Sequence, residues 1–194
     1  ISIIETLKIK PNNKLFEMLD IIQKWNRKTD TDSQGAGIYG VLYYQLIRNY
    51  RSEIIKNNNT VSKETLLLAL ADTKSYLIDN FGSTNITLGD FQKLVRGNKE
   101  IPIWGLPDVI TAMSSRPYKN GMHKVTQGES YIGLVRFNKK GPILESIISF
   151  GNSDNPESDH YTDQMDLYSK FKTKKMTIDK EQIYKEAKSI YHPN

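Results

Sequence analysis

The sequence predicts an α+β protein whose first half is helical and whose second half contains antiparallel strands. Between positions 15 and 78, apolar residues recur at three- and four-residue steps, which is typical of amphipathic helices. Two runs rich in β-branched and aromatic residues, Tyr131–Phe137 and Ile143–Phe150, then flank a short polar segment and predict a hairpin. The chain has 194 residues, 38% of them hydrophobic and 25% charged, so we expect residues 1–194 to fold as a single unit.

The mainly helical part is expected to cover residues 1–86. Residues 1–10 alternate loosely between apolar and polar types and predict a strand or an extended segment. A helix is then expected over Leu15–Trp25, where the apolar residues fall at helical spacing. Asn12 or Asn13 would cap that helix, because asparagine is favoured at helix N-termini.

Two more helices are predicted in this part. The second is indicated by an apolar residue at every fourth position from Ile38 to Ile54. Small residues near its start, including Gly37 and Gly40, permit close approach of a neighbouring element. The third helix follows Ser62, which has cap character, and ends near Gly82. Three such helices suit either a bundle or the outer layer on a sheet.

Residues 87–150 are predicted to form loops and strands. A short helix is expected over Leu88–Val95, followed by a turn at Arg96–Asn98. The prolines of Ile101–Pro107 exclude a central strand, because proline donates no ladder hydrogen bond. The predicted hairpin turns over the four residues Asn138–Gly141, which suits a longer hairpin loop.

Residues 151–194 are predicted to form a tight loop followed by two C-terminal helices. The Gly151–Gln164 loop concentrates Asn, Ser, Asp and Pro, whose side chains replace absent backbone hydrogen bonds. Helices are expected near Thr162–Lys170 and over Asp179–Tyr191. No internal repeat, low-complexity tract or convincing linker is visible, which agrees with a single unit.

Composition excludes several classes of function. The net charge is +5, but the lysines are dispersed and no nucleic-acid-binding fingerprint accompanies the one dense basic run, Lys170–Lys175. No nucleic-acid partner is therefore expected. The chain has no cysteine, which excludes disulfides, thiolate catalysis and cysteine-ligated metal. No apolar run approaches the roughly 20 residues needed to cross a bilayer, so no membrane partner is expected, and no signal-peptide pattern is visible.

Ser158, Asp159, His160 and Asp163 invite interpretation as a Ser-His-Asp catalytic group. Catalytic triads take their members from separate elements that are oriented by packing. Neighbours on one loop more often satisfy each other and the backbone. A structural hydrogen-bond network is therefore the preferred interpretation. Catalysis and a role at a substrate entrance or interface are the alternatives.

Other candidate site residues have simpler structural interpretations. A calcium site would draw on Asp154, Asp159, Asp163 and Asp166, but the spacing of known calcium loops is absent. No zinc-ligand spacing relates His123, His160 and His192. Helix capping explains Asp30, Asp32 and Ser33. A sugar-binding face or, preferably, the edge of the core explains Tyr39, Tyr43, Tyr44 and Tyr50. A nucleotide loop is not supported by Gly121 and Gly128.

Four motifs resemble, in order, those of the penicillin acylase (penicillin amidase) family, which includes acyl-homoserine-lactone and aculeacin acylases. They are Trp25 with Asp30–Ser33, Ala36 and Tyr39; Leu88–Phe91 with Arg96–Gly97 and Ile101–Pro102; Gly128–Tyr131; and the Gly151–Gln164 loop. Two positions depart from the family pattern: Leu88 stands where tryptophan is usual and Asp159 where proline is usual. The resemblance spans Trp25 to Tyr168 and identifies the chain as a C-terminal segment of the family's large (β) chain.

This resemblance implies an N-terminal-nucleophile (Ntn) hydrolase, an αββα sandwich in which a self-cleaving precursor exposes a serine at the start of the large chain. The α-amino group of that serine acts as base, and an asparagine and a backbone N–H form the oxyanion hole. The reaction is hydrolysis of linear acyl amides. Those residues belong to the first half of the large chain, and Ile1 has no nucleophilic side chain. We therefore expect no catalytic, cofactor-binding or metal-binding residue here, no cofactor, and no activity from this chain alone.

The resemblance also implies the partners. They are the remainder of the same precursor, namely the small chain and the N-terminal part of the large chain. A small-molecule acyl amide of the penicillin or acyl-homoserine-lactone type is the substrate of the whole enzyme, which suggests a role in antibiotic metabolism. The implied location is periplasmic or secreted. A non-catalytic binding module that uses the aromatic-rich helical half is the alternative function.

Overall fold

The computed structural model describes residue 7, residues 15–107 and residues 109–190. Within them the chain forms two compact units, Ile1–Gly128 and Glu129–Asn194. Helices and sheets occur together, which confirms the α+β class. The expectation of a single unit stays a prediction. The expected segment over residues 1–10 lies outside the described residues, apart from Leu7, which is buried.

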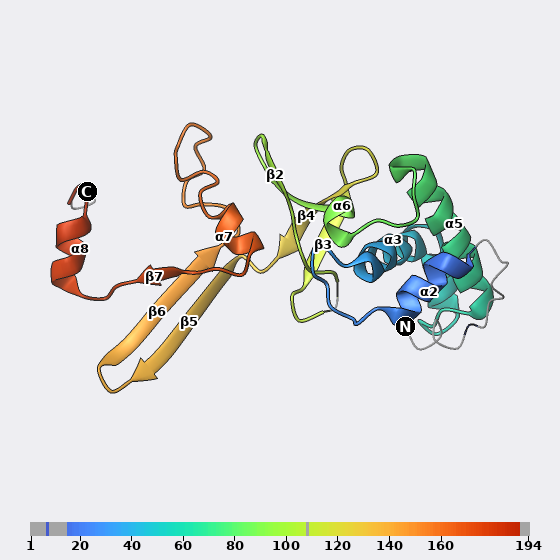
Figure 1. Cartoon of the computed structure of the whole chain (residues 1–194), viewed down its shortest axis with the longest axis horizontal. Helices are drawn as coiled ribbons and strands as arrows, with labels where there is room; N and C mark the ends of the chain where they lie inside the picture. The colour runs from blue at the N-terminus through green and yellow to red at the C-terminus, as the bar shows by residue number, and fades with distance from the viewer. Residues whose placement is uncertain (1–6, 8–14, 108, 191–194) are drawn as a thin grey trace. The chain divides into compact units, whose positions relative to one another are not determined.

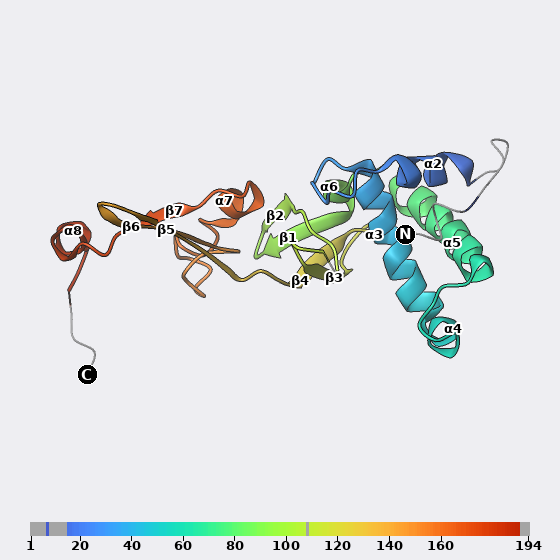
Figure 2. The same ribbon diagram turned by 90° about the horizontal axis from the view of Figure 1, so that it is seen from below.

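From residue 15 to residue 91, the first unit is mainly helical (Figure 1). Its helices are α2 (Phe16–Lys24), α3 (Gln34–Asn49), α4 (Arg51–Lys56), α5 (Lys63–Phe81) and the short α6 (Leu88–Phe91). Helix α3 is central, since it packs against α2, α5 and α6 (Figure 2). The three predicted helices are therefore present, and they form a helical layer around α3.

Helix ends follow local sequence rules at most positions. The Ser62 side chain accepts a hydrogen bond from the backbone N–H of Thr65 at the start of α5, as expected. Gly82 ends α5 with φ +68°, the left-handed conformation that glycine adopts without strain. Asn12 and Asn13, the predicted caps of α2, lie outside the described residues, and the N-cap position is occupied by Leu15, which makes no side-chain cap hydrogen bond.

The predicted helix through Ile54 is interrupted at Tyr50. This residue ends α3 and begins α4 with φ −124° and ψ 12°, outside helical geometry. Its phenol donates a 2.7 Å hydrogen bond to the Asp72 carboxylate on α5, which raises the pKa of Tyr50. The regular apolar step correctly marked the buried face of α3, but it did not reveal this break.

The first unit also contains a mixed four-stranded sheet in the order β2-β1-β4-β3. Its strands are β1 (Gln92–Arg96), β2 (Lys99–Pro102), β3 (Met113–Pro117) and β4 (His123–Gly128). Strands β1 and β4 pair in parallel, and the other pairs are antiparallel. The fold therefore places β4 next to β1 although β2 and β3 lie between them in sequence.

Between residues 88 and 128, the structure corrects some of the expectations and confirms others. The short helix expected to reach Val95 ends at Phe91, because the chain turns directly into β1. The predicted turn is confirmed by the pairing of Arg96 with Lys99. Strand β2, which contains Pro102, lies at the sheet edge, in agreement with the exclusion of a central strand. Strands β3 and β4 were not predicted.

A continuous hydrophobic core holds the helices of the first unit together. Residues of α2, α3 and α5 contribute most of it, joined by the α6 region. Its largest fully buried side chains include Met18, Leu19, Ile22, Ile38, Leu42, Leu66, Leu70, Leu77, Leu88 and Phe91. Gly37 sits where a Cβ would lie 2.6 Å from the Thr87 backbone, so the small face predicted for α3 does permit close packing.

The second unit is a three-stranded antiparallel sheet in the order β5-β6-β7, with two short helices (Figure 1). Its elements are β5 (Tyr131–Asn138), β6 (Gly141–Ile148), α7 (Met165–Ser169), β7 (Lys174–Met176) and α8 (Lys180–Glu186). The predicted hairpin is confirmed. Its turn is shorter than expected, because Asn138 pairs with Gly141, so only two residues lie between the strands. Both C-terminal helices are shorter than expected, and β7 was not predicted.

Candidate functional site

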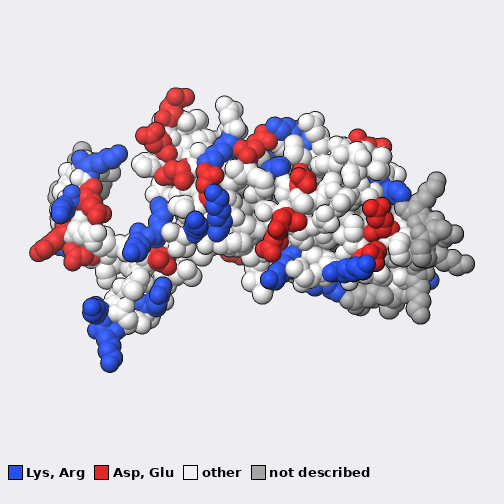
Figure 3. Space-filling view, viewed as in Figure 1, with Lys and Arg blue, Asp and Glu red and all other residues white. Residues whose placement is uncertain are grey.

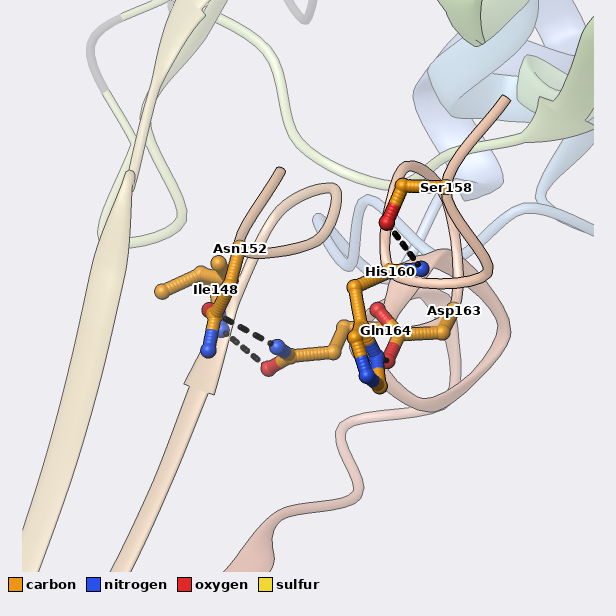
Figure 4. Close-up of polar contacts among 6 residues, drawn as sticks. All are labelled: Ile148, Asn152, Ser158, His160, Asp163 and Gln164. Carbon is orange, nitrogen blue, oxygen red and sulfur yellow. Dashed lines mark hydrogen bonds and ion pairs between the residues drawn. The ribbon is translucent and has the colours of Figure 1, made fainter. Parts of the chain in front are cut away.

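The Gly151–Gln164 loop is closed by one buried side chain, Gln164 (Figure 4). Its Oε1 accepts a 3.3 Å hydrogen bond from the Ile148 backbone N–H, and its Nε2 donates a 3.2 Å bond to Asn152 Oδ1. The Gln164 backbone N–H also donates to the Phe150 carbonyl at 2.8 Å. The end of the loop is thereby fastened to the end of β6, where the loop begins.

Gly151 lets the two sides of this loop approach each other. A Cβ at this position would lie 2.1 Å from the His160 carbonyl oxygen and 2.7 Å from Asp163 Oδ1. The same carbonyl accepts a 3.1 Å hydrogen bond from the Ser153 backbone N–H. Glycine is therefore required here by the close backbone approach.

The structure brings together two members of the candidate Ser-His-Asp group but not the third. The His160 Nδ1 lies 2.9 Å from the Asp163 carboxylate, and both side chains are exposed to solvent. The Ser158 hydroxyl instead accepts a 3.1 Å hydrogen bond from the His160 backbone N–H (Figure 4). The arrangement is thus a local network of side chains and backbone, and it contains no serine–imidazole hydrogen bond. The absence of a catalytic role stays a prediction.

The other candidate ligands also have local roles. Within the described ranges, no group of three or more His, Asp or Glu side chains is placed to hold a metal ion. His192 lies outside those ranges. The Ser33 side chain, and not Asp30 or Asp32, caps α3 by accepting a 3.2 Å hydrogen bond from the Ala36 N–H. That no metal binds stays a prediction.

The aromatic residues of α3 lie at the edge of the core, as preferred. Tyr39 stacks on Trp25 with ring centroids 5.3 Å apart, and Tyr43 meets Tyr44 edge to face. Tyr39, Tyr44 and Tyr50 are partly buried against the core cluster. They therefore serve packing, and Tyr44 in addition lines a pocket.

This pocket, which we call the α3 pocket, lies in the first unit and has a volume of about 190 Å³. Most of its wall is apolar or aromatic. Three residues with nitrogen-containing side chains, Gln45, Arg48 and His123, also line it. The remaining lining residues are Val41, Tyr44, Ile47, Tyr76, Phe91 and Pro117.

His123 is the buried titratable group of the α3 pocket, with only 5% of its surface exposed. Its ring lies against Tyr44 and Phe91, at centroid distances of 4.6 and 4.5 Å. Its Nδ1 is 3.4 Å from Ser115 Oγ, and the Ser115 hydroxyl and backbone N–H both donate to the Tyr44 oxygen. Burial, together with the smaller effect of the nearby Arg48 charge, lowers the pKa of His123 to about 4.

These contacts indicate binding or packing rather than catalysis. An imidazole with this pKa is neutral and only weakly basic at pH 7, which is unsuited to general-base work. Ser115 is itself buried, and its hydroxyl donates to Tyr44 instead of facing a substrate. The sequence did not reveal this cluster, because Ser115 and His123 lie on β3 and β4, which were not predicted. The alternation of more and less buried residues in β3 and β4 extends over too few positions to be recognised in the sequence.

Charges on the visible surface are mixed in sign. Lys and Arg side chains are interspersed with Asp and Glu over the face shown (Figure 3). The part of the chain that the structure describes has no helix long and apolar enough to cross a membrane. The absence of nucleic-acid and membrane partners remains an expectation.

Comparison with known proteins now identifies the family. The family model described as penicillin amidase matches residues 3–185. The chain belongs to the penicillin amidase family. Two relatives are acyl-homoserine lactone acylases PvdQ, from Pseudomonas syringae pv. syringae and Pseudomonas savastanoi pv. phaseolicola. Each is 35% identical over 98 residues, which cover 49% of this chain and 13% of the relative.

These findings confirm the predicted family and its acyl-homoserine-lactone-acylase branch. The match spans only 13% of the length of those penicillin amidase relatives. Among solved structures, the thermostable penicillin G acylase from Alcaligenes faecalis aligns with all of this chain and 44% of its own, with a TM-score of 0.45 and 12% identity.

Proposed function

We propose that this chain is a C-terminal structural segment of the large chain of an Ntn hydrolase. The whole enzyme cleaves acyl-amide bonds of the penicillin or acyl-homoserine-lactone type through an N-terminal serine that lies outside this chain. Membership of the penicillin amidase family supports the amidase activity. The names of the relatives support an acyl-homoserine lactone as substrate.

One face of the β5–β6 hairpin carries the proposal. Tyr131, Val135 and Phe137 alternate along β5 and expose 59%, 55% and 82% of their surfaces. Residues directly opposite on an antiparallel partner share the same face. Here those partners are Ile148, Leu144 and Pro142, and Met176 of β7 lies opposite Leu144.

Such an exposed apolar face is unusual for a sheet that no other layer covers. Strand β5 lies at the edge of the sheet and is exposed along nearly all of its length. Long apolar edge strands promote aggregation and are normally covered. A second β-layer contributed by the rest of the precursor would cover this face and complete a sandwich, which is the packing that paired sheets use.

The chain's own polar networks support an inactive role. His160 is paired with Asp163 in an exposed loop, and His123 is enclosed beside Ser115. Neither imidazole activates a hydroxyl that is open to a substrate. In this proposal the segment has no catalytic group of its own and needs no cofactor. Its role is to close the sheet sandwich and shape the enzyme.

The proposal includes an autoproteolytic precursor located in the periplasm or secreted. The test is the intact mass and N-terminal sequence of the protein purified from its native host. A chain much longer than this one, beginning with serine, would support the proposal. A mature protein of about the size of this chain would refute it.

A second assay examines the chain alone. Incubation with a chromogenic acyl amide is expected to give no turnover above the buffer rate. Turnover that disappears in Ser158→Ala or His160→Ala would show that the Gly151–Gln164 loop is catalytic, and the structural role would be wrong.

A further inference from the structure

The α3 pocket lies in the first unit and is independent of the proposed hydrolytic function. Its volume of about 190 Å³ exceeds the roughly 150 Å³ of an engineered apolar cavity that holds benzene. It therefore has room for one ring or for an alkyl chain of roughly four to six carbons. Its walls of Val41, Tyr44 and Phe91 favour such a group, because apolar surface gains free energy when it leaves water.

Gln45 brings a hydrogen-bond donor to this pocket. The residue is 8% exposed, and its Oε1 accepts a 3.0 Å hydrogen bond from Asn49 Nδ2. The Nε2 of the same amide has no hydrogen-bond partner in the described part of the chain, and it is not sealed from solvent. Because this amide N–H has no partner, a hydrogen bond from it to an acceptor on a ligand would stabilise the bound ligand.

Arg48 adds a positive charge beside that donor. It follows Gln45 by three positions on α3, so the two side chains share a helix face. Among the described residues, Arg48 makes no ion pair with a carboxylate. Its charge acts on two other lining groups: burial lowers the pKa of His123 and the Arg48 charge adds to that shift, whereas burial raises the pKa of Tyr76 and the Arg48 charge opposes it.

These groups together define the chemistry of a ligand. A guanidinium and an amide N–H suit a carboxylate, which accepts several hydrogen bonds and carries the complementary charge. We propose that the α3 pocket binds a small monocarboxylate with a compact apolar tail. The carboxylate lies against Arg48 and Gln45, and the tail lies among Val41, Tyr44 and Phe91.

Calorimetric titration of the full 194-residue chain at pH 7 tests the proposal, with hexanoate as ligand and hexanamide as its neutral counterpart. Hexanoate is expected to bind at one saturable site and at least tenfold more tightly than hexanamide, because a charge-assisted hydrogen bond is lost with the amide. Arg48→Gln should weaken hexanoate about tenfold and leave hexanamide unchanged.

Arg51→Gln is the matched control. It removes the same charge from an exposed position on α4 that does not line the pocket, and it should leave hexanoate affinity unchanged. Thermal unfolding of each variant in the absence of ligand checks that the fold is intact. Equal losses in the two variants would show non-specific attraction by net charge and would overturn the proposal.

Tail length provides an independent measurement that needs no variant. From propanoate to hexanoate, each methylene should strengthen binding by about fourfold, since burial of a CH₂ is worth about 0.8 kcal/mol. Beyond the length that fills the cavity, the gain should stop. No saturable binding of hexanoate, or equal binding of hexanoate and hexanamide, would overturn the proposal.

Discussion

Acidification should destabilise the first unit through His123. The pKa of this imidazole is about 4 in the folded chain, against an ordinary value near 6.5. The unfolded chain therefore binds a proton at a pH where the folded chain does not. The stability supplied by the neutral buried ring is fully present above pH 6.5 and is lost as the pH falls towards 4.

The size of the effect follows from the two pKa values. The linkage relation for one proton gives a loss of about 2 kcal/mol between pH 7 and pH 5, rising to about 3 kcal/mol at pH 4. The loss levels off only below about pH 3, where both states are protonated. The loss is large for one residue, since the whole stability of a domain is typically about 5–15 kcal/mol.

Urea unfolding followed by tryptophan fluorescence measures this loss in the first unit alone, because both tryptophans of the chain, Trp25 and Trp104, lie in that unit. The comparison is with His123→Gln, whose neutral amide does not titrate. Carboxylates contribute equally to both proteins, so the difference between their free energies of unfolding isolates the histidine. The wild-type advantage should shrink by about 2 kcal/mol from pH 7 to pH 5. Parallel curves for the two proteins would refute the reasoning, as would a pKa of His123 near 6.5 measured by NMR.

Three substitutions test the closure of the Gly151–Gln164 loop and the capping of α6. Gly151→Ala should destabilise the Gly151–Gln164 loop by about 2 kcal/mol, because the added Cβ would meet the His160 carbonyl. Faster amide hydrogen exchange at the end of β6 would show this destabilisation, and unchanged exchange would contradict it. Gln164→Leu should also destabilise the loop by about 2 kcal/mol, since it removes both side-chain hydrogen bonds that close the loop. The same exchange experiment measures this loss, and protection equal to that of the wild type would show that Gln164 does not close the loop. Thr87→Ala should cost the first unit about 1 kcal/mol, because Thr87 and Asp90 form a reciprocal cap on α6; urea unfolding by tryptophan fluorescence measures it, and no shift of the midpoint would argue against the cap.

The elements that depend on local sequence could be predicted. Helix α5 begins at a serine cap and ends at a left-handed glycine, and both signals lie within a few residues of the helix ends. The β5–β6 hairpin is likewise set by adjacent residues. Strands β3 and β4 could not be found in this way, although they pair with each other as a hairpin, because their residues are mostly polar. Strand β4 also pairs in parallel with β1, although β2 and β3 lie between these two strands in the sequence.

The candidate sites show the same division. Loop composition indicated that the side chains of residues 151–164 would bond to one another and to the backbone, and they do. It did not indicate that Gln164 is the buried member, since this depends on where the end of β6 lies. The α3 pocket depends on residues of five separate elements meeting, namely α3, α5, α6, β3 and β4. No spacing within one segment reveals the approach of His123 to Tyr44 and Phe91.

The two units differ in how much apolar surface they bury, and this difference bears on what the second unit needs. The core cluster lies entirely within the first unit. Among the described residues of the second unit, the buried apolar side chains are Ile147, Met165 and Tyr168. The Tyr168 phenol donates a 2.6 Å hydrogen bond to the Glu129 carbonyl, and burial raises its pKa to about 12. Three such side chains give little hydrophobic free energy to offset the entropy lost on ordering the chain. This small core agrees with the proposal that the second unit receives apolar contacts from outside itself, and the exposed face of β5 and β6 is where the sheet can receive them.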